Sequence, residues 1–355
     1  MKLFTCRNCG QLLYFENIVC ERCNHALGYQ WEEDALLTLT PAQDEQWLVA
    51  AAPETLYTYC ANHAYNVCNW LIPTNTGESL CLACQLNRTI PSLDQDENHL
   101  RWQKLETAKH RLVYSLLQLR LPVVSKQNDA KWGLAFDFLA DNVGETVQPI
   151  TTGHANGIIT INIAEADDAR REQLRQSLVE PYRTLLGHFR HEIAHYYWMH
   201  FARSRGWRRA FRQVFGNEKS DYAQALAQHY AAPPTDEWRE EFISAYAAVH
   251  PWEDWAETWA HYLHIVDTLE TAHAFGMQID PLVEADETLA ADIVFNAYQQ
   301  TNFDRLIETW LPVAFAMNSL NRAMGQPDLY PFVLTPAVLS KMAFVHDSVR
   351  TEQVR

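Results

Sequence analysis

Hydrophobic and polar positions follow two different rhythms along the chain, and the rhythm changes near residue 95. Before that point, short apolar runs are interrupted by Gly, Pro, Asn and Asp, a pattern typical of short strands and loops. The polar run PSLDQDENH, from Pro91 to His99, predicts a boundary. Leucines then recur at helical spacing, which predicts an amphipathic helix from about 99 to 120, closed by Pro122. We therefore predict two domains, over residues 1–95 and 96–355.

The second domain is predicted to be mostly helical, with a short sheet. The segments Gly133–Asp141 and Gly157–Asp167 are alternating or β-branched enough to form strands. A long helix is expected from about 168 to 203, broken near Pro181, and another across HPWEDWAETWAHYLHIVDTLETA. The predicted fold class is α+β: a small Cys-rich zinc-ribbon β module followed by a helical domain of the zincin metallopeptidase type.

All eight cysteines precede residue 85, so they belong to the predicted β module. The first four have the spacing C-x2-C-x10-C-x2-C, with which four thiolates can close a tetrahedron around zinc: Cys6, Cys9, Cys20 and Cys23. Gly10 and Asn24 follow the two pairs and suit the tight turns that such pairs need. The second four are spaced more loosely, and His63 could replace one of their thiolates: Cys60, Cys68, Cys81 and Cys84. We predict two structural zinc sites.

The main alternative for the cysteines is a disulfide framework, which requires an oxidising compartment. The opening MKLFTCRNCG lacks the apolar run of a secretory signal, and no stretch approaches the roughly 18 apolar residues of a membrane span. We therefore expect a soluble protein that is not exported and has no membrane partner. The formal net charge of −16 disfavours a phosphate backbone, so no nucleic-acid partner is expected.

The stretch HFRHEIAHYYW contains H-E-x-x-H as His191, Glu192 and His195. Residues four apart lie on one face of a helix, where two imidazoles can bind one zinc. Glu192, beside them, can serve as general base for a zinc-activated water. This pattern predicts a catalytic zinc site.

The third ligand separates the subclasses of such sites. A metzincin would need Gly at 198 and His at 201, but the chain has Trp198 and Phe201, and His200 is expected to be an ordinary helix residue. The segment PWEDWAE instead offers Glu253 as the ligand and Glu257, one turn later, to orient a ligand histidine. Asp254 stays open as a substitute ligand.

An oxyanion donor is also needed in a zinc peptidase. Tyr246, seven residues before Glu253, is a candidate, with a core tyrosine as the equally weighted alternative. His250 is a weaker candidate.

An extended peptide substrate is expected to lie against a strand near Ile158–Asn162.

H-E-x-x-H followed by Y-x6-E-x-x-x-E resembles the gluzincin arrangement of the anthrax lethal factor and Pro-Pro endopeptidase group over about residues 155–270. The strings YCANHAYNVCNWLIP, CLACQLNRTIPSL and TGHANGIITINIAEAD are similar to a bacterial family of predicted zinc-binding metallopeptidases with an N-terminal zinc ribbon. The resemblance implies a cytoplasmic bacterial peptidase. Its implied roles are zinc ligation by His191, His195 and Glu253, catalysis by Glu192 and Tyr246, and orientation of a ligand by Glu257. The aromatic residue that follows the ligand Glu in the lethal factor pattern is here Asp254.

The main hypothesis is a peptidase with one catalytic and two structural zinc ions, whose partner is a peptide or protein substrate. The β module could also bind a protein partner. One alternative is a catalytically silent, zinc-stabilised adaptor, although an intact H-E-x-x-H argues against it. A further alternative is a DNA-associated protease like those of the SprT group, from which the N-terminal acidic module differs.

Overall fold

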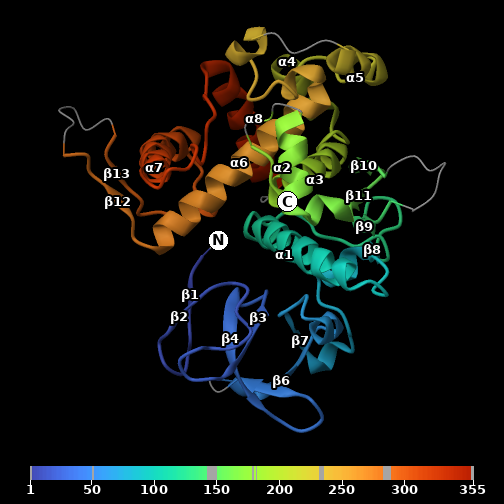
Figure 1. Ribbon diagram of the computed structural model, residues 1–355, viewed down its shortest axis with the longest axis vertical. Coiled ribbons are helices and arrows are strands. Elements are labelled where there is room, and N and C mark those ends of the chain that lie inside the picture. Colours follow the sequence, from blue (N-terminus) through green and yellow to red (C-terminus); the bar gives the residue numbers. More distant parts are fainter. Residues whose placement is uncertain are drawn as a thin grey trace. The chain divides into compact units, whose positions relative to one another are not determined.

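The first eighty residues fold around short strands, as the interrupted apolar pattern predicts. The computed structural model describes residues 2–49, 52–141, 150–177, 180, 182–231, 236–282 and 289–352. The strands of this region are β1 (Phe4–Thr5), β2 (Leu12–Leu13), β3 (Ala26–Gln30), β4 (Ala35–Pro41), β5 (Trp47–Val49), β6 (Ala52–Tyr59) and β7 (Leu71–Pro73). β1 pairs with β2, and the other five form an antiparallel sheet in the order β3-β4-β5-β6-β7 (Figure 1). Leu37, Leu39, Val49, Tyr57 and Leu71 pack together as the core of this sheet.

A second sheet has the order β10-β11-β9-β8 and consists of β8 (Asn87–Thr89), β9 (Ala135–Leu139), β10 (Gly153–Ala155) and β11 (Ile158–Asn162). β9 runs parallel to both β8 and β11. The two predicted strands are therefore present, but β11 ends before Asp167. The Asn162 side chain accepts a hydrogen bond from the Ala164 amide and starts a 3-10 turn there.

Helices make up most of the remaining chain. They are α1 (Asp96–Gln118), α2 (Asp168–Ser177), α3 (Leu185–Phe201), α4 (Arg205–Val214), α5 (Tyr222–Ala231), α6 (Pro251–Ala274), α7 (Phe303–Ala323) and α8 (Pro336–Glu352). Short 3-10 turns are η1 (Ala61–Tyr65), η2 (Thr74–Thr76), η3 (Cys84–Leu86), η4 (Ile163–Ala166), η5 (Asp236–Glu240), η6 (Ala247–Val249) and η7 (Ala297–Gln299), and β12 (Gln278–Ile279) pairs with β13 (Ala291–Asp292). The predicted α+β class is confirmed. The expected helix from 168 to 203 is two helices, α2 and α3, and Pro181 lies outside the described residues.

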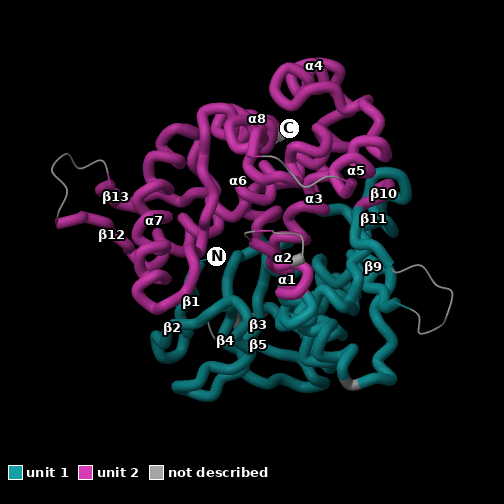
Figure 2. The backbone as a smooth tube through the Cα atoms, turned by 45° about the horizontal axis from the view of Figure 1, so that its top comes forward, with its two compact units in different colours: residues 1–114, 123–153, 157–170 teal, residues 115–122, 154–156, 171–355 magenta. Residues whose placement is uncertain are grey.

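The chain forms two compact units (Figure 2). Unit 1 comprises residues 1–114, 123–153 and 157–170, and unit 2 comprises residues 115–122, 154–156 and 171–355. The described chain is thus not divided at residue 95, and the predicted domains 1–95 and 96–355 stay a prediction. Among the described helices, none combines the length and apolar character that crossing a bilayer requires.

Candidate metal centres

Helix α3 carries the H-E-x-x-H residues, and its start is fixed by a side-chain cap. The Thr184 hydroxyl accepts a hydrogen bond of 3.0 Å from the Gly187 amide, which satisfies one of the free donors of the first turn. Seven residues into the helix, His191 and His195 lie one turn apart on the same face.

Helix α6 supplies the carboxylates, and it too begins where its sequence predicts. His250 caps it by accepting a 3.2 Å hydrogen bond from the Trp252 amide, and Pro251 occupies the first turn, where a missing amide hydrogen costs nothing. Glu253 follows in the same turn, where the partial positive charge of the helix end favours a carboxylate. α3 and α6 are held together by buried aromatic residues, with Tyr197 stacked on Trp259 and the Trp255 indole bonded to the Ala194 carbonyl.

The ligand atoms of His191, His195 and Glu253 converge within 4.8 Å of one another. The two Nε2 atoms are 3.3 Å apart, and Glu253 Oε2 lies 2.9 Å from that of His191 and 3.7 Å from that of His195. Nitrogen atoms bound at about 2.0–2.1 Å to one tetrahedral zinc lie roughly 3.3 Å apart. The three side chains therefore fit a zinc ion.

Glu257 fixes the orientation of His191. Its Oε1 accepts from His191 Nδ1 at 2.8 Å, which leaves Nε2 facing the other ligand atoms, and its Oε2 accepts from the Ser244 hydroxyl at 2.7 Å. Burial opposes a charge on His191, but Glu253 and Glu257 outweigh it and hold the pKa of His191 well above its usual range. Burial likewise opposes ionisation of Glu257, yet the pKa of Glu257 is lowered by His191.

Two tyrosines lie beside the three ligand atoms. The ring centre of Tyr246 is 5.9 Å from that of His191, so the predicted phenol lies at the site. Tyr222, which the sequence reasoning missed, donates a 2.8 Å hydrogen bond to Glu253 Oε1. Burial, followed by the charge of Glu253, raises the pKa of both phenols, so each keeps its proton and can donate it. Tyr222 is the first residue of α5, and its distance in sequence from Glu253 fits no motif that would have predicted the contact.

The two alternatives left open by the sequence, Asp254 as metal ligand and His250 as oxyanion donor, contact other partners than the three ligand atoms. Asp254 is buried and pairs with Lys341 Nζ at 2.7 Å, because it points to α8 while its neighbour Glu253 points to α3. His250 is engaged as the cap of α6 and with the Ser220 carbonyl. The ring of His200 lies against Tyr196.

A buried ion pair lies behind the H-E-x-x-H residues. Arg190, next to His191, pairs with Asp267 of α6 and contacts His264 Nδ1. Asp267 also accepts hydrogen bonds from Ser115 and Tyr298. A buried charge is tolerated only when it is paired and hydrogen-bonded in this way.

The four cysteines of each predicted set converge as well. The Sγ atoms of Cys6 and Cys23, and those of Cys9 and Cys20, are 3.6 Å apart, and those of Cys68 and Cys81 are 3.7 Å apart. Sulfurs at about 2.3 Å from one tetrahedral zinc lie roughly 3.8 Å apart, whereas a disulfide bond is about 2.05 Å. All eight cysteines are free, so the disulfide alternative is excluded and both groups fit zinc.

The turns of the first cysteine group follow the sequence prediction. Gly10 and Asn24 have φ angles of 71° and 57° and return amide hydrogen bonds to the carbonyls of Cys6 and Cys20. In the second group, Cys60, Cys68, Cys81 and Cys84 are all buried. His63 stacks on Tyr59 instead of joining this group, with its Nδ1 on the Cys68 carbonyl.

Comparison with known proteins matches two segments of the chain to family models. Residues 98–348 match the model of a family described as "putative zinc-binding metallo-peptidase", and residues 3–95 match a zinc-ribbon domain. The chain belongs to this metallopeptidase family. It is 43% identical over 350 residues to proteins of Mycobacterium bovis and Mycobacterium tuberculosis that carry the name "uncharacterized protein", covering 98% of this chain and 95% of theirs. No solved structure matches the chain significantly.

For a metallopeptidase of this family, the strand expected to pair with the substrate must have a free edge. β11 does not, because it lies between β10 and β9, so the expectation that a peptide pairs with Ile158–Asn162 is wrong. The end strand of that sheet is β10, and its His154 ring is stacked 6.3 Å from that of His195. Among the described residues, β10 is therefore the end strand of this sheet that lies beside His195.

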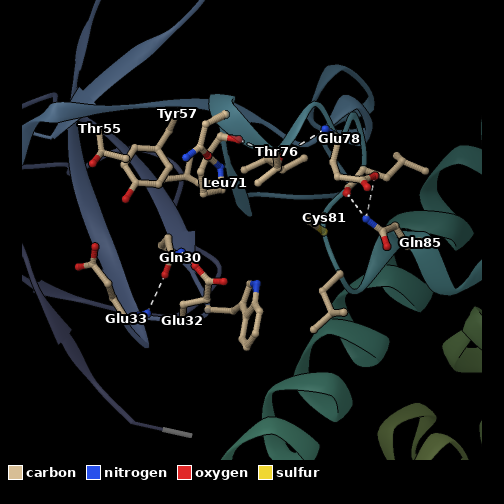
Figure 3. A pocket seen from close by; sticks show the side chains of 16 residues that line it. Gln30, Glu32, Glu33, Thr55, Tyr57, Leu71, Thr76, Glu78, Cys81 and Gln85 are labelled. Atoms are coloured by element: carbon tan, nitrogen blue, oxygen red, sulfur yellow. Dashed lines mark hydrogen bonds between the residues drawn. The ribbon is translucent and has the colours of Figure 1, made fainter. Parts of the chain in front are cut away.

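The zinc-ribbon segment of unit 1 also contains a hollow of about 600 Å³ (Figure 3). The carboxylates of Glu32, Glu33 and Glu78 line it together with Tyr57 and Cys81. None of the His191, His195 and Glu253 side chains contributes to it, so it is separate from the H-E-x-x-H residues. Its acidic lining is unsuited to a phosphate group.

Proposed function

We propose that the protein is a zinc-dependent peptidase of the gluzincin type, with its catalytic zinc held by His191, His195 and Glu253. The observation that carries the proposal is the convergence of these three ligand atoms, from residues about sixty positions apart in the chain, beside two phenols. The imidazole side chains are 12% and 18% exposed, so the two histidines are not fully enclosed. A structural zinc site is normally closed, whereas a catalytic one keeps an open position.

Zinc bound there would polarise the scissile carbonyl and acidify the attacking water. Glu192 accepts the proton of that water and returns it to the leaving amine. Tyr246 donates its phenolic hydrogen to the oxyanion, and Tyr222 holds Glu253 through its second carboxylate oxygen. Glu257 keeps the His191 ring in the tautomer whose Nε2 faces the metal.

The substrate is expected to be an extended peptide that pairs with β10. That strand is short, and the ring of its His154 is stacked 6.3 Å from that of His195, so a bound peptide would pass close to the ligand atoms. The eight cysteines would hold two further zinc ions, which makes three per chain.

Metal content per chain tests this proposal. Elemental mass spectrometry should find three zinc ions in the zinc-loaded wild type and two in the variant His191→Ala/His195→Ala. The variant His200→Ala, on the same helix, should keep three. Two ions in both the wild type and the double variant would refute the catalytic site, and a wild type that holds three but cleaves nothing in a broad peptide library would favour the adaptor alternative.

A further inference from the structure

One more imidazole faces metal-binding side chains in the described structure, and it belongs to α1. His110 is 5% exposed, and its Nε2 is 3.4 Å from Cys68 Sγ and 3.8 Å from Cys84 Sγ. It lies in the segment that matches the peptidase family, whereas the cysteines lie in the segment that matches the zinc ribbon. The spacing of the cysteines does not predict it, because His110 is 26 residues beyond Cys84.

The orientation of the His110 ring is that of a metal-site histidine. Its Nδ1 is 2.7 Å from the Glu106 backbone carbonyl, which can only accept, so Nδ1 carries a hydrogen and Nε2 is the atom presented to the sulfurs. Histidines that bind metals usually donate their other ring N–H in this way. A nitrogen and a sulfur on one tetrahedral zinc lie roughly 3.5 Å apart, between the two distances observed.

The neighbouring carboxylate is engaged elsewhere. Glu106 could approach the same metal, since its oxygen lies within 4.8 Å of His110 and Cys84. It is fully buried, however, and accepts from Lys109 at 2.8 Å, from Asn87 at 2.7 Å and from the Trp102 indole at 3.0 Å. These partners satisfy the carboxylate, so His110 is the residue of α1 that is available to the metal.

We propose that His110 is a fifth donor of the second cysteine site, able to take the place of a lost thiolate. Four positions around a tetrahedral zinc are then served by five donors, Cys60, Cys68, Cys81, Cys84 and His110. Zinc at this site is held jointly by the ribbon and by α1, and it survives the loss of one cysteine. In the first site, Cys6, Cys9, Cys20 and Cys23 form a group to which no other described residue adds a ligand atom.

A double-mutant comparison tests this inference, which rests on the proposed binding of zinc by the second cysteine group. Zinc per chain is measured for the zinc-loaded proteins after gel filtration. Cys60→Ser should keep the zinc of its site, and Cys60→Ser/His110→Ala should lose it. The matched control Cys60→Ser/His99→Ala changes another histidine of α1, which contacts the Tyr65 carbonyl, and should keep it. In the first site, Cys9→Ser alone should lose its zinc.

The inference is overturned if Cys60→Ser loses its zinc as completely as the double variant, or if both keep it. A second measurement covers variants that fail to fold. With cadmium in place of zinc, the cadmium NMR resonance of the second site should shift in the otherwise intact variant His110→Ala, while that of the first site stays. Metal release to a chelator from the second site should become roughly 10–100-fold faster. An unchanged resonance and release rate would reject a role for His110, whereas a wild type without metal in this group would refute the group itself.

Discussion

The second cysteine group and the H-E-x-x-H group differ in exposure and in how their ligands are brought together. The cysteines are buried and lie within 25 residues of sequence, so any metal there is enclosed. His191 and His195 are partly exposed and meet Glu253 from a helix about sixty residues away. A metal that only stabilises a fold requires closure, and one that works on a substrate requires access. The proposed roles of the two groups therefore rest on their exposure more than on their ligand types.

The largest effect that we predict is a loss of catalysis at the H-E-x-x-H group. Glu192→Gln keeps the size of the side chain but cannot accept the proton of the attacking water, so peptide hydrolysis should fall roughly 10²–10⁴-fold. Zinc content should stay unchanged, because Glu192 is not among the converging ligand atoms. Glu241→Gln, at an exposed position, is the control and should keep full activity. Undiminished hydrolysis by Glu192→Gln would reject the proposed general base.

The second prediction concerns the buried ion pair between Arg190 and Asp267, which joins α3 to α6 behind the H-E-x-x-H residues. Arg190→Met should lower the free energy of unfolding by roughly 3–5 kcal/mol, because it leaves the Asp267 carboxylate buried without its ion pair. Denaturant unfolding measures this change. The double variant Arg190→Met/Asp267→Leu should recover part of the loss, since it removes the stranded charge as well. A loss below about 1 kcal/mol in the single variant would show that the pair is not a main support of α3.

The sequence alone predicts some of the residues of these sites but not others. The H-E-x-x-H spacing and the cysteine spacing are local, so the chain alone predicts which of those side chains can share a face or a turn. The choice between Glu253 and Asp254 depends on the direction each takes from the first turn of α6, and Lys341 lies almost ninety residues further on. Tyr222 and His110 meet their partners only through packing across tens of residues, and the pairing of β11 on both edges follows from the sheet order. The hydrophobic periodicity of the sequence does not predict contacts of this kind.

The third prediction concerns the stability of α6, whose buried His261 is not among the proposed metal ligands. Burial lowers the pKa of His261 to about 4, against the opposing charge of Glu257. The unfolded chain takes up this proton near pH 6.5, while the folded protein resists it until about pH 4. The stability that this residue contributes is therefore complete above pH 6.5 and is lost as the pH falls toward 4, by roughly 3 kcal/mol.

His261→Gln can keep a hydrogen bond to Tyr330 and does not titrate. Between pH 6.5 and 4, its free energy of unfolding should fall less steeply than that of the wild type, as measured by urea unfolding at several pH values. Parallel curves for the two proteins would mean that His261 takes up its proton at the same pH in the folded and unfolded chains.

The smallest effect is expected at Tyr222, and it separates support of a ligand from chemistry. Tyr222→Phe removes the hydrogen bond to Glu253 Oε1 but leaves Oε2, which faces the histidines, in place. Zinc affinity should fall about 10-fold, as for other partners of metal ligands, and activity at saturating zinc should recover. Tyr246→Phe should do the reverse, keeping zinc affinity and losing turnover, because its phenol is the proposed donor to the oxyanion. Zinc titrations of both variants, with kcat measured at each zinc concentration, distinguish the two. If saturating zinc restores Tyr246→Phe but not Tyr222→Phe, the two roles are exchanged, and Tyr222 is the oxyanion donor.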